Sequence, residues 1–299
     1  MFLIGGVNMK MNIDQAKGML VGLAVGDALG TTLEFTRPSQ NDKLHTEMIG
    51  RGPFNLPAGA FTDDSSLALA MASSLIDTEE FDPIDVIQEF WKWYQDGKYS
   101  TENRCFDIGN TTRDGLNDWS SNFEKPYAGS VDNNASGNGG IMRIAPIIIW
   151  NRHNYEDAMV DAVRSSMLTH ASEKCIRYAQ AMASVLWHGS LDESCIYKPE
   201  LQMPEHFASN GNPFSGGYVA ETYSAACHAV KTTSSFEDAI VQAVNYRFDA
   251  DTTGAVAGQI AGSIYGMSGI PQRWLDTLLW REKIEDMAVQ LWEMAPTND

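Results

Sequence analysis

Apolar positions recur every three or four residues along most of the 299-residue chain. This spacing is typical of amphipathic helices, whereas the strict alternation of half-buried strands is almost absent. We therefore expect an all-α fold. No change in composition marks a boundary between domains, which favours a single compact multi-helix domain. The pattern predicts helices at about 14–30, 64–77, 83–96, 111–119, 139–151, 155–169, 172–188, 217–231, 235–246, 252–267, 271–280 and 283–294.

Hydroxyl and acidic residues stand where several of these helices are predicted to begin. Their side chains are suited to accept a hydrogen bond from the first helical turn. We expect caps at Asp14, Thr62, Asp82, Ser172 and Ser235. Between the helices, residues 120–138 and 190–216 are rich in glycine and polar residues and are predicted to form loops. Loops of this length are uncommon in a compact domain unless they have a function.

Glycine recurs at every fourth position in two of the predicted helices. In a helix interior, each glycine costs about 1 kcal/mol relative to alanine. A spacing of four places the glycines on one face, where they let another backbone approach closely. We therefore predict that these two helices cross at the centre of the protein. The two glycine stripes are Gly18, Gly22, Gly26 and Gly30, and Gly254, Gly258, Gly262 and Gly266.

The charge balance narrows the classes of partner. The chain has 21 basic and 39 acidic residues, a formal net charge of -18. Nucleic acids and anionic membranes attract basic surfaces, so we expect neither as a partner. An acidic chain is suited to collecting divalent cations. No apolar stretch approaches the roughly 18 residues that a membrane-spanning helix needs.

The chain start and the cysteines indicate a cytoplasmic protein. The apolar start of the chain is short, and it lacks the basic region and cleavage site of a signal peptide. The four cysteines are far apart and no CxxC pair occurs, which favours reduced thiols over disulfides or zinc ligands. They are Cys105, Cys175, Cys195 and Cys227.

Carboxylates and hydroxyls gather at the predicted starts of two helices. Such residues are ordinary caps, but a cap needs only one side-chain oxygen. Here each site offers two carboxylates and a threonine, and adjacent carboxylates repel each other unless a positive charge lies between them. Hard oxygen ligands without nearby Cys or His suit Mg²⁺, Mn²⁺ or Ca²⁺, and the set is large enough for two ions. The residues are Thr62, Asp63, Asp64, Asp249, Asp251 and Thr252, with Asp27 and Glu34 close to the first glycine stripe.

Other polar and aromatic residues admit two interpretations each. Asn138, Gly139 and Gly140 precede a predicted helix start, which is either an anion site or a simple turn. His170 follows a predicted helix and is either a cap, a core residue or a ligand contact. Tyr218 is an aromatic residue of the kind that more often belongs to the core than to a ligand site.

Six segments of the chain form a recognisable set: GMLVGLAVGDALGTTLEF (18–35), GAFTDDSSLALAMASSL (59–75), CFDIGNTTRDGL (105–116), SGNGGIMRIAPI (136–147), LTHAS (168–172) and FDADTTGAVAGQIAGSIYG (248–266). Together they resemble the ADP-ribosylglycohydrolases, and in particular bacterial enzymes similar to dinitrogenase-reductase-activating glycohydrolase. The segments occur in the order found in that family, and the resemblance spans about residues 14–295.

The resemblance implies an all-α catalytic domain over residues 13–299, after an N-terminal extension at 1–12. It implies two divalent cations, Mg²⁺ or Mn²⁺, and hydrolysis of the bond between ADP-ribose and a protein side chain. By motif, the metal ligands would be Thr62, Asp63, Asp64, Asp249, Asp251 and Thr252, and the catalytic residues Glu34, Asp63 and Asp64. Asp107 would pair with an arginine guanidinium. Asn138, Gly139, Gly140 and His170 would line the ribose and diphosphate, with Tyr218 near the adenine.

The sequence departs from the family pattern at two positions. The bacterial motif usually reads Asn-Leu-Gly-Asp/Asn-Asp-Ala-Asp-Thr, but Arg247 replaces the glycine and Phe248 the small polar residue. Glycine at that point allows positive φ and close approach to a ligand, so the change bears on substrate preference. We expect a hydrolase that removes ADP-ribose from arginine on an ADP-ribosylated protein and releases ADP-ribose. The alternatives are a serine or O-acetyl-ADP-ribose linkage, or a non-catalytic immunity protein that binds an ADP-ribosyltransferase.

Overall fold

The computed structural model describes residues 11–39, 41–192 and 213–297. Over these residues the fold is helical, and the only β-type pairings are isolated bridges. The predicted all-α class is confirmed. The α-helices are α1 Ile13–Gly30, α2 Asp63–Thr78, α3 Pro83–Asp96, α4 Asn110–Ser120, α5 Ala145–Trp150, α6 Tyr155–Met167, α7 Glu173–His188, α8 Val219–Lys231, α9 Phe236–Val244, α10 Ala250–Tyr265, α11 Gln272–Thr277 and α12 Arg281–Met294. Two 3₁₀ turns, η1 Asn133–Ala135 and η2 Met267–Gly269, complete the described elements.

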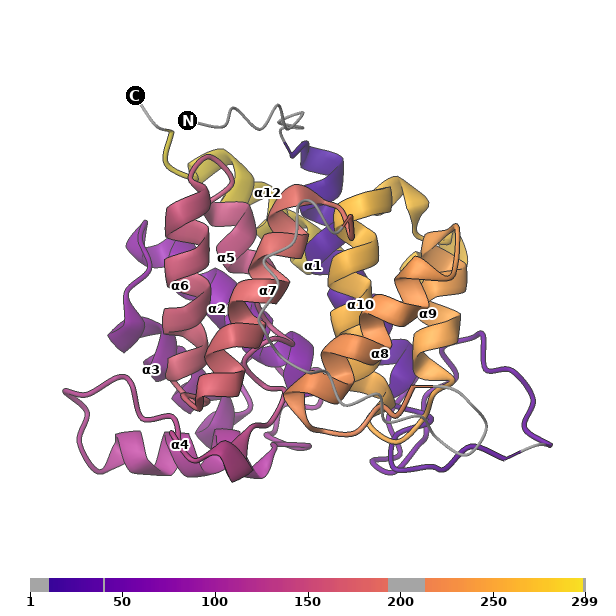
Figure 1. Cartoon of the computed structure of the whole chain (residues 1–299), viewed down its shortest axis with the longest axis horizontal. Helices are drawn as coiled ribbons and strands as arrows, with labels where there is room; N and C mark the ends of the chain where they lie inside the picture. Colours follow the sequence, from indigo (N-terminus) through magenta and orange to yellow (C-terminus); the bar gives the residue numbers. More distant parts are fainter. Residues whose placement is uncertain (1–10, 40, 193–212, 298–299) are drawn as a thin grey trace.

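Helices α1 and α10 lie side by side at the centre of the molecule (Figure 1). They run antiparallel, because Gly22 faces Gly258 while Gly26 faces Gly254. A Cβ atom on Gly22 would lie 2.5 Å from the carbonyl oxygen of Gly258, so the two backbones touch directly. Both helices are buried along most of their length, and the predicted crossing of the two glycine stripes is confirmed.

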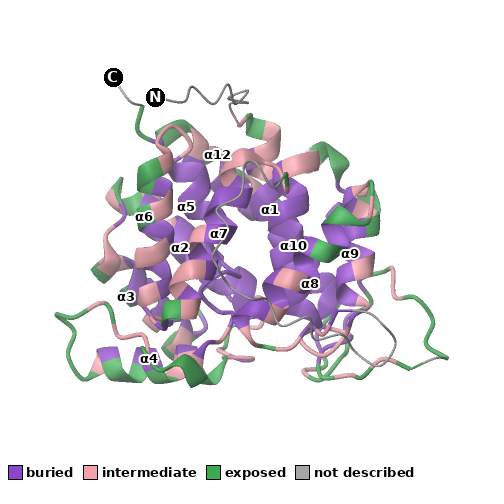
Figure 2. Ribbon diagram, in the orientation of Figure 1, coloured by how far each residue is buried: buried purple, intermediate pink, exposed green. Residues whose placement is uncertain are grey.

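The other helices form a shell around this central pair. Helix α2 packs against α3 and α12, α6 packs against α7, and α8 and α9 both pack against α10. The short α5 is wholly buried between α2, α6 and α12. Figure 2 shows the buried residues concentrated in the middle and the exposed ones on the outer helices and loops. None of the helices in the described part of the chain has both the length and the apolar character that a membrane crossing requires.

The helix caps follow the sequence prediction in three of five cases. The first helix is capped by Asn12, whose Oδ1 accepts from Gln15 N at 2.9 Å, so the predicted cap at Asp14 is wrong. Thr62 stands at the N-cap position of α2, but its hydroxyl donates to Asp27 Oδ1 at 2.9 Å instead of capping the helix. The confirmed caps are Asp82, Ser172 and Ser235.

The predicted helix at 139–151 is wrong over residues 139–144. These residues form turns, and the helix begins only at Ala145. The side chain of Gln259 on α10 explains the difference, because its Nε2 donates to Met142 O at 2.8 Å and its Oε1 accepts from Ala145 N at 2.9 Å. These bonds use backbone groups that a continuous helix would pair internally. The predicted helix at 271–280 also ends early, because the backbone becomes extended at Leu278.

The first predicted loop, 120–138, is fully described: Ser120 ends α4, and the rest forms an irregular segment that contains η1. Most of the loop predicted at 190–216 lies outside the described residues, as do Cys195 and residues 1–10 of the predicted N-terminal extension. The other three cysteines are free thiols, as predicted.

Candidate functional site

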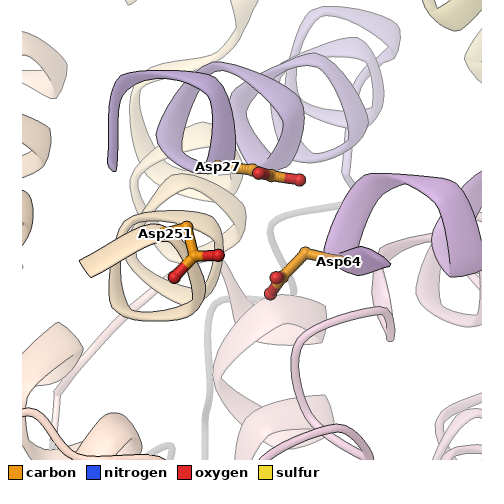
Figure 3. A group of neighbouring side chains, drawn as sticks. All are labelled: Asp27, Asp64 and Asp251. Atoms are coloured by element: carbon orange, nitrogen blue, oxygen red, sulfur yellow. The ribbon is translucent and has the colours of Figure 1, made fainter. Parts of the chain in front are cut away.

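Three helices bring carboxylates to one point beside the central pair. Asp27 comes from the last turns of α1, Asp64 from the first turn of α2 and Asp251 from the first turn of α10. Their side chains point toward a common centre (Figure 3), and one oxygen of each lies within 4.8 Å of the others. The three side chains are almost fully buried. The close crossing of α1 and α10 is therefore what places Asp27 opposite Asp251.

Asp27 is saturated by hydrogen bonds from the start of α2. Its Oδ1 accepts from the Thr62 amide and hydroxyl, both at 2.9 Å. Its Oδ2 accepts from the Ser65 amide at 3.0 Å and the Ser65 hydroxyl at 2.6 Å. Burial raises the pKa of Asp27 to about 6, although these bonds favour the charged form. Asp27 therefore joins α1 to α2 and orients Thr62.

A second group of carboxylates shares Asp251 with the first. One oxygen each of Glu34, Asp107 and Asp251 lies within 4.8 Å of the others. Glu34 follows α1, whereas Asp107 belongs to the loop before α4 and has a left-handed φ of 55°. The carboxyl group of Asp107 therefore lies close to those of both Asp251 and Glu34. The backbone of this loop thus directs the Asp107 side chain toward the acidic cluster. A sequence pattern alone does not reveal that orientation.

The remaining oxygen donors complete the ring around Asp64 and Asp251. Thr62 Oγ1 lies 3.3 Å from Asp64 Oδ2 and 3.3 Å from Asp251 Oδ2. Thr252 Oγ1 lies 3.4 Å from Asp64 Oδ2. Asp249 is held by Asn138, whose Nδ2 donates to Asp249 Oδ2 at 2.6 Å.

Burial and mutual repulsion make this cluster electrostatically costly. Burial, then the neighbouring carboxylate charges, raises the pKa of Glu34 to about 11. The pKa values of Asp63, Asp64 and Asp251 are also raised, first by burial and then by the other carboxylates. The same two causes raise the pKa of Asp107. Carboxylates in such surroundings need either protons or a cation to balance their charge.

The cluster fits a divalent cation because some of its oxygens are buried without a partner. Glu34 Oε2, Asp64 Oδ1 and Asp251 Oδ1 accept no hydrogen bond from any described residue. A buried carboxylate oxygen without a partner is unfavourable, and a metal ion is one group that supplies it. The donors are all hard oxygens, which suit Mg²⁺, Mn²⁺ or Ca²⁺ rather than zinc.

A cavity of about 1480 Å³ opens onto this cluster. Several predicted site residues line it together, namely Glu34, Asp63, Asp107, Asn138, Gly139, His170, Tyr218, Asp249, Asp251 and Thr252. Thr62 and Asp64 lie behind this lining, within the acidic cluster. Gly140 does not line the cavity, because its Cα faces Ser166 and an added Cβ would overlap the Ser166 hydroxyl. Gly140 therefore lies just outside the lining, packed against Ser166.

Aromatic side chains that the sequence analysis did not select for the site also line the cavity. Phe35, Phe214 and Phe248 belong to this wall, and the rings of Phe214 and Phe248 lie 4.6 Å apart. Tyr218 stands at the N-cap position of α8, and Lys174 Nζ lies over its ring, 5.0 Å from the ring centroid. Asp27 was named from its place near the first glycine stripe, and its signal is a lone acid within the apolar run of residues 18–30.

Arg247 and Phe248 adopt the left-handed backbone conformation that the glycine of the family motif would adopt without strain. Their φ angles are 67° and 57°, in the left-handed region. The Arg247 guanidinium pairs with Asp42 at 3.0 Å and donates to Thr36 Oγ1 at 2.9 Å. It is thus engaged at the edge of the site and is not paired with Asp107.

Comparison with known proteins places the chain among ADP-ribosylglycohydrolases. The family model for ADP-ribosylglycohydrolase matches residues 9–299. A protein of Serratia proteamaculans (strain 568) named ADP-ribosylarginine hydrolase Tri1 is 39% identical, over 96% of this chain and 81% of its own length. One of Pseudomonas putida (strain GB-1) with the same name is 37% identical, over 96% of this chain and 80% of its own. The ADP-ribosyl-[dinitrogen reductase] glycohydrolase of Rhodospirillum rubrum is 31% identical, over 89% of this chain and 90% of its own.

A solved structure gives the same result at the level of the fold. The structure of an ADP-ribosylglycohydrolase-related protein complex matches with a TM-score of 0.81 and 32% identity, over 96% of this chain and 100% of that chain. The family match spans the helices, the acidic cluster and the cavity described above. The chain therefore belongs to the ADP-ribosylglycohydrolase family.

Proposed function

We propose that the protein is a metal-dependent hydrolase that removes ADP-ribose from modified arginine side chains of a target protein. The observation that carries this proposal is the acidic cluster of Glu34, Asp107 and Asp251 at the wall of a large cavity. Relatives at 37% and 39% identity are named for hydrolysis of ADP-ribosylarginine, which supports the arginine linkage.

Two divalent cations, Mg²⁺ or Mn²⁺, are proposed to be held by the oxygen donors of the cluster. When bound, they would offset the carboxylate charge and provide Lewis-acid stabilisation at the ribose. The partnerless oxygens of Asp64 and Asp251 support this assignment. The proposed ligands are Thr62, Asp63, Asp64, Asp249, Asp251 and Thr252.

The carboxylates around the cavity have distinct proposed roles in hydrolysis. A water attacks the anomeric carbon, the bond from that carbon to the guanidino nitrogen breaks, and the departing nitrogen gains a proton. Of the adjacent pair Asp63 and Asp64, only Asp63 lines the cavity. We therefore assign Asp63 as the group that accepts the proton of the attacking water. Glu34 also lines the cavity and is assigned to proton transfer or substrate positioning. Asn138, Gly139, His170 and Tyr218 are proposed to contact the ADP-ribose.

Asp107 provides the test of the arginine linkage. A guanidinium is bound strongly by a carboxylate, at about 1.5–3 kcal/mol for a charged hydrogen bond. Asp107→Asn keeps the size of the side chain and one acceptor oxygen but removes the charge. We expect release of ADP-ribose from arginine-linked protein to fall at least about tenfold, a loss of about 1.4 kcal/mol, while release from serine-linked protein changes little.

Asp114→Asn is the matched control, because Asp114 lies on the neighbouring helix α4 with its side chain 71% exposed. It should leave release of ADP-ribose from both substrates unchanged. Equal activity of wild type and Asp107→Asn on the arginine-linked substrate would remove the arginine assignment and favour the serine or O-acetyl-ADP-ribose linkage. No release from either substrate by the wild type would favour a non-catalytic binding protein.

A further inference from the structure

A fully buried arginine lies behind the cavity wall. Arg143 has no exposed surface, and its guanidinium carbon lies 4.5 Å from the ring centroid of Phe90. Its Nη2 donates to Thr169 Oγ1 at 2.7 Å and, more weakly, to Ser165 O at 3.3 Å. Burial lowers the pKa of Arg143 to about 9, and the charges of Asp63 and Asp64 oppose that change, so the group stays protonated at neutral pH.

Thr169 connects this arginine to a residue of the cavity. Its Oγ1 lies 2.8 Å from His170 Nδ1, in addition to the 2.7 Å contact with Arg143 Nη2. A guanidinium has donors only, so Thr169 Oγ1 accepts from Arg143. The hydroxyl keeps one proton, and donating it to His170 Nδ1 gives both that proton and Nδ1 a partner. If Nδ1 instead carried the proton and donated it to Thr169 Oγ1, the hydroxyl proton of Thr169 would be buried without an acceptor.

Two glycines make room for the other edge of the His170 ring. A Cβ on Gly139 would lie 2.6 Å from His170 Cε1, and one on Gly137 would lie 3.0 Å from Nε2. Both glycines line the cavity, as does His170. The ring is therefore fixed with Nδ1 toward Thr169 and Nε2 toward the glycine wall of the cavity. Burial, then the charge of Arg143, lowers the pKa of His170 to about 3, so the ring is neutral at neutral pH.

We propose that Arg143 and Thr169 are positioning residues that hold His170 as the tautomer with its proton on Nε2, which then donates to an acceptor oxygen of the ligand. A neutral imidazole carries its one proton on the nitrogen that does not accept a hydrogen bond. The tautomer assignment depends only on Arg143, Thr169 and His170. The identity of the acceptor, a ribose or diphosphate oxygen of ADP-ribose, rests on the proposed function.

The tautomer is read directly from the imidazole nitrogens. We would record long-range ¹H–¹⁵N spectra of the labelled, ligand-free protein near neutral pH, with His170→Gln to assign the signals. The wild type should show a protonated Nε2 and an unprotonated Nδ1. Thr169→Val keeps the side-chain shape but lacks the hydroxyl, so a second population with the proton on Nδ1 should appear, and Thr169→Ser should restore the wild-type pattern. Arg143→Met, which removes the donor that orients the hydroxyl, should also give the second population.

Each result decides one part of the proposal. A wild-type ring protonated on Nδ1 would overturn it without any variant, and an unchanged pattern in Thr169→Val or Arg143→Met would remove that residue from it. In calorimetry with ADP-ribose and Mg²⁺, Thr169→Val should bind about tenfold more weakly, the value of one hydrogen bond, while Thr169→Ser should not. Equal affinity of wild type and Thr169→Val would overturn the ligand contact. Failure of the wild type to bind ADP-ribose would instead count against the proposed function, since the tautomer is measured without ligand.

Discussion

Residues with strained backbone angles occur both at the site and far from it. Arg247 and Phe248 are consecutive left-handed residues beside the cavity, a conformation that costs about 1–3 kcal/mol per non-glycine residue. Their backbone is fixed from two sides, because Phe248 N donates to Thr36 O at 2.9 Å and Ser215 Oγ donates to Arg247 O at 2.6 Å. These bonds hold Phe248 in the cavity wall, so the strain serves the shape of the site.

Glu79 has the same backbone conformation without such a role. It ends α2 with φ 59°, is exposed, and places a carboxylate at the negative end of the helix. Glu79→Gly should therefore raise the free energy of unfolding by about 1 kcal/mol in urea titration, because glycine adopts this angle freely. Glu80→Gly, at the next exposed position and without positive φ, should produce no gain. A loss of stability in Glu79→Gly would contradict this interpretation.

At the scale of elements, the contact between α1 and α10 determines both stability and site geometry. A Cβ on Gly258 would overlap the carbonyl oxygen of Gly22. We expect Gly258→Ala to lower the free energy of unfolding by about 2 kcal/mol or more, despite the higher helix propensity of alanine. Because Asp27 and Asp251 are carried by these two helices, the variant should also bind Mg²⁺ or Mn²⁺ more weakly in calorimetry.

Gly109→Ala is the control for this prediction. The nearest atom to a Cβ at Gly109 is Thr112 Oγ1, at 4.0 Å, so there is space for the methyl group. Its free energy of unfolding should change by no more than about 0.5 kcal/mol. Equal stability of the Gly258→Ala and Gly109→Ala variants would show that the two central helices do not pack as described.

The elements also show what the sequence could and could not predict. The glycine stripes predicted the central crossing because residues four apart lie on the same face of a helix. The turn at 139–144 could not be predicted, because it depends on Gln259, a polar side chain more than a hundred residues away. Likewise, the sequence showed Asp27 as an acid beside the first glycine stripe, but its role in orienting Thr62 depends on how α1 meets α2. Local patterns determine elements, whereas tertiary contacts determine their exact limits and the partners of polar groups.

At the scale of the whole molecule, the acidic cluster couples stability to pH and metal. The pKa of Asp27 is raised from 3.8 to about 6, so the folded state binds this proton more tightly than the unfolded state does. The stability from this group is fully present below pH 3.8 and is lost as the pH rises through about 6. The pKa values of Asp63, Asp64 and Asp251 are raised as well, so the contributions of these groups to stability change with pH in the same direction.

Metal binding should reverse this dependence, because cations bind the deprotonated carboxylates. In EDTA, we expect the midpoint temperature of thermal unfolding to decrease as the pH is raised from 5 to 8. Saturating Mg²⁺ or Mn²⁺ should raise that midpoint more at pH 8 than at pH 5. A metal-induced increase that is equal or larger at pH 5 would contradict the assignment of the cluster as a cation site.

The measurement that tests the account most directly is release of ADP-ribose from an arginine-ADP-ribosylated protein, with and without divalent metal. The wild type should release ADP-ribose in Mg²⁺ or Mn²⁺, lose that activity in EDTA and regain it when excess metal is added. Asp251→Asn changes a residue shared by both carboxylate groups. Mutating a residue that only supports a metal ligand costs roughly 10–100-fold in activity, so changing a proposed ligand itself should lower the rate of ADP-ribose release by more than that. Release that continues undiminished in EDTA, or in Asp251→Asn, would contradict a metal-dependent hydrolase built on this cluster.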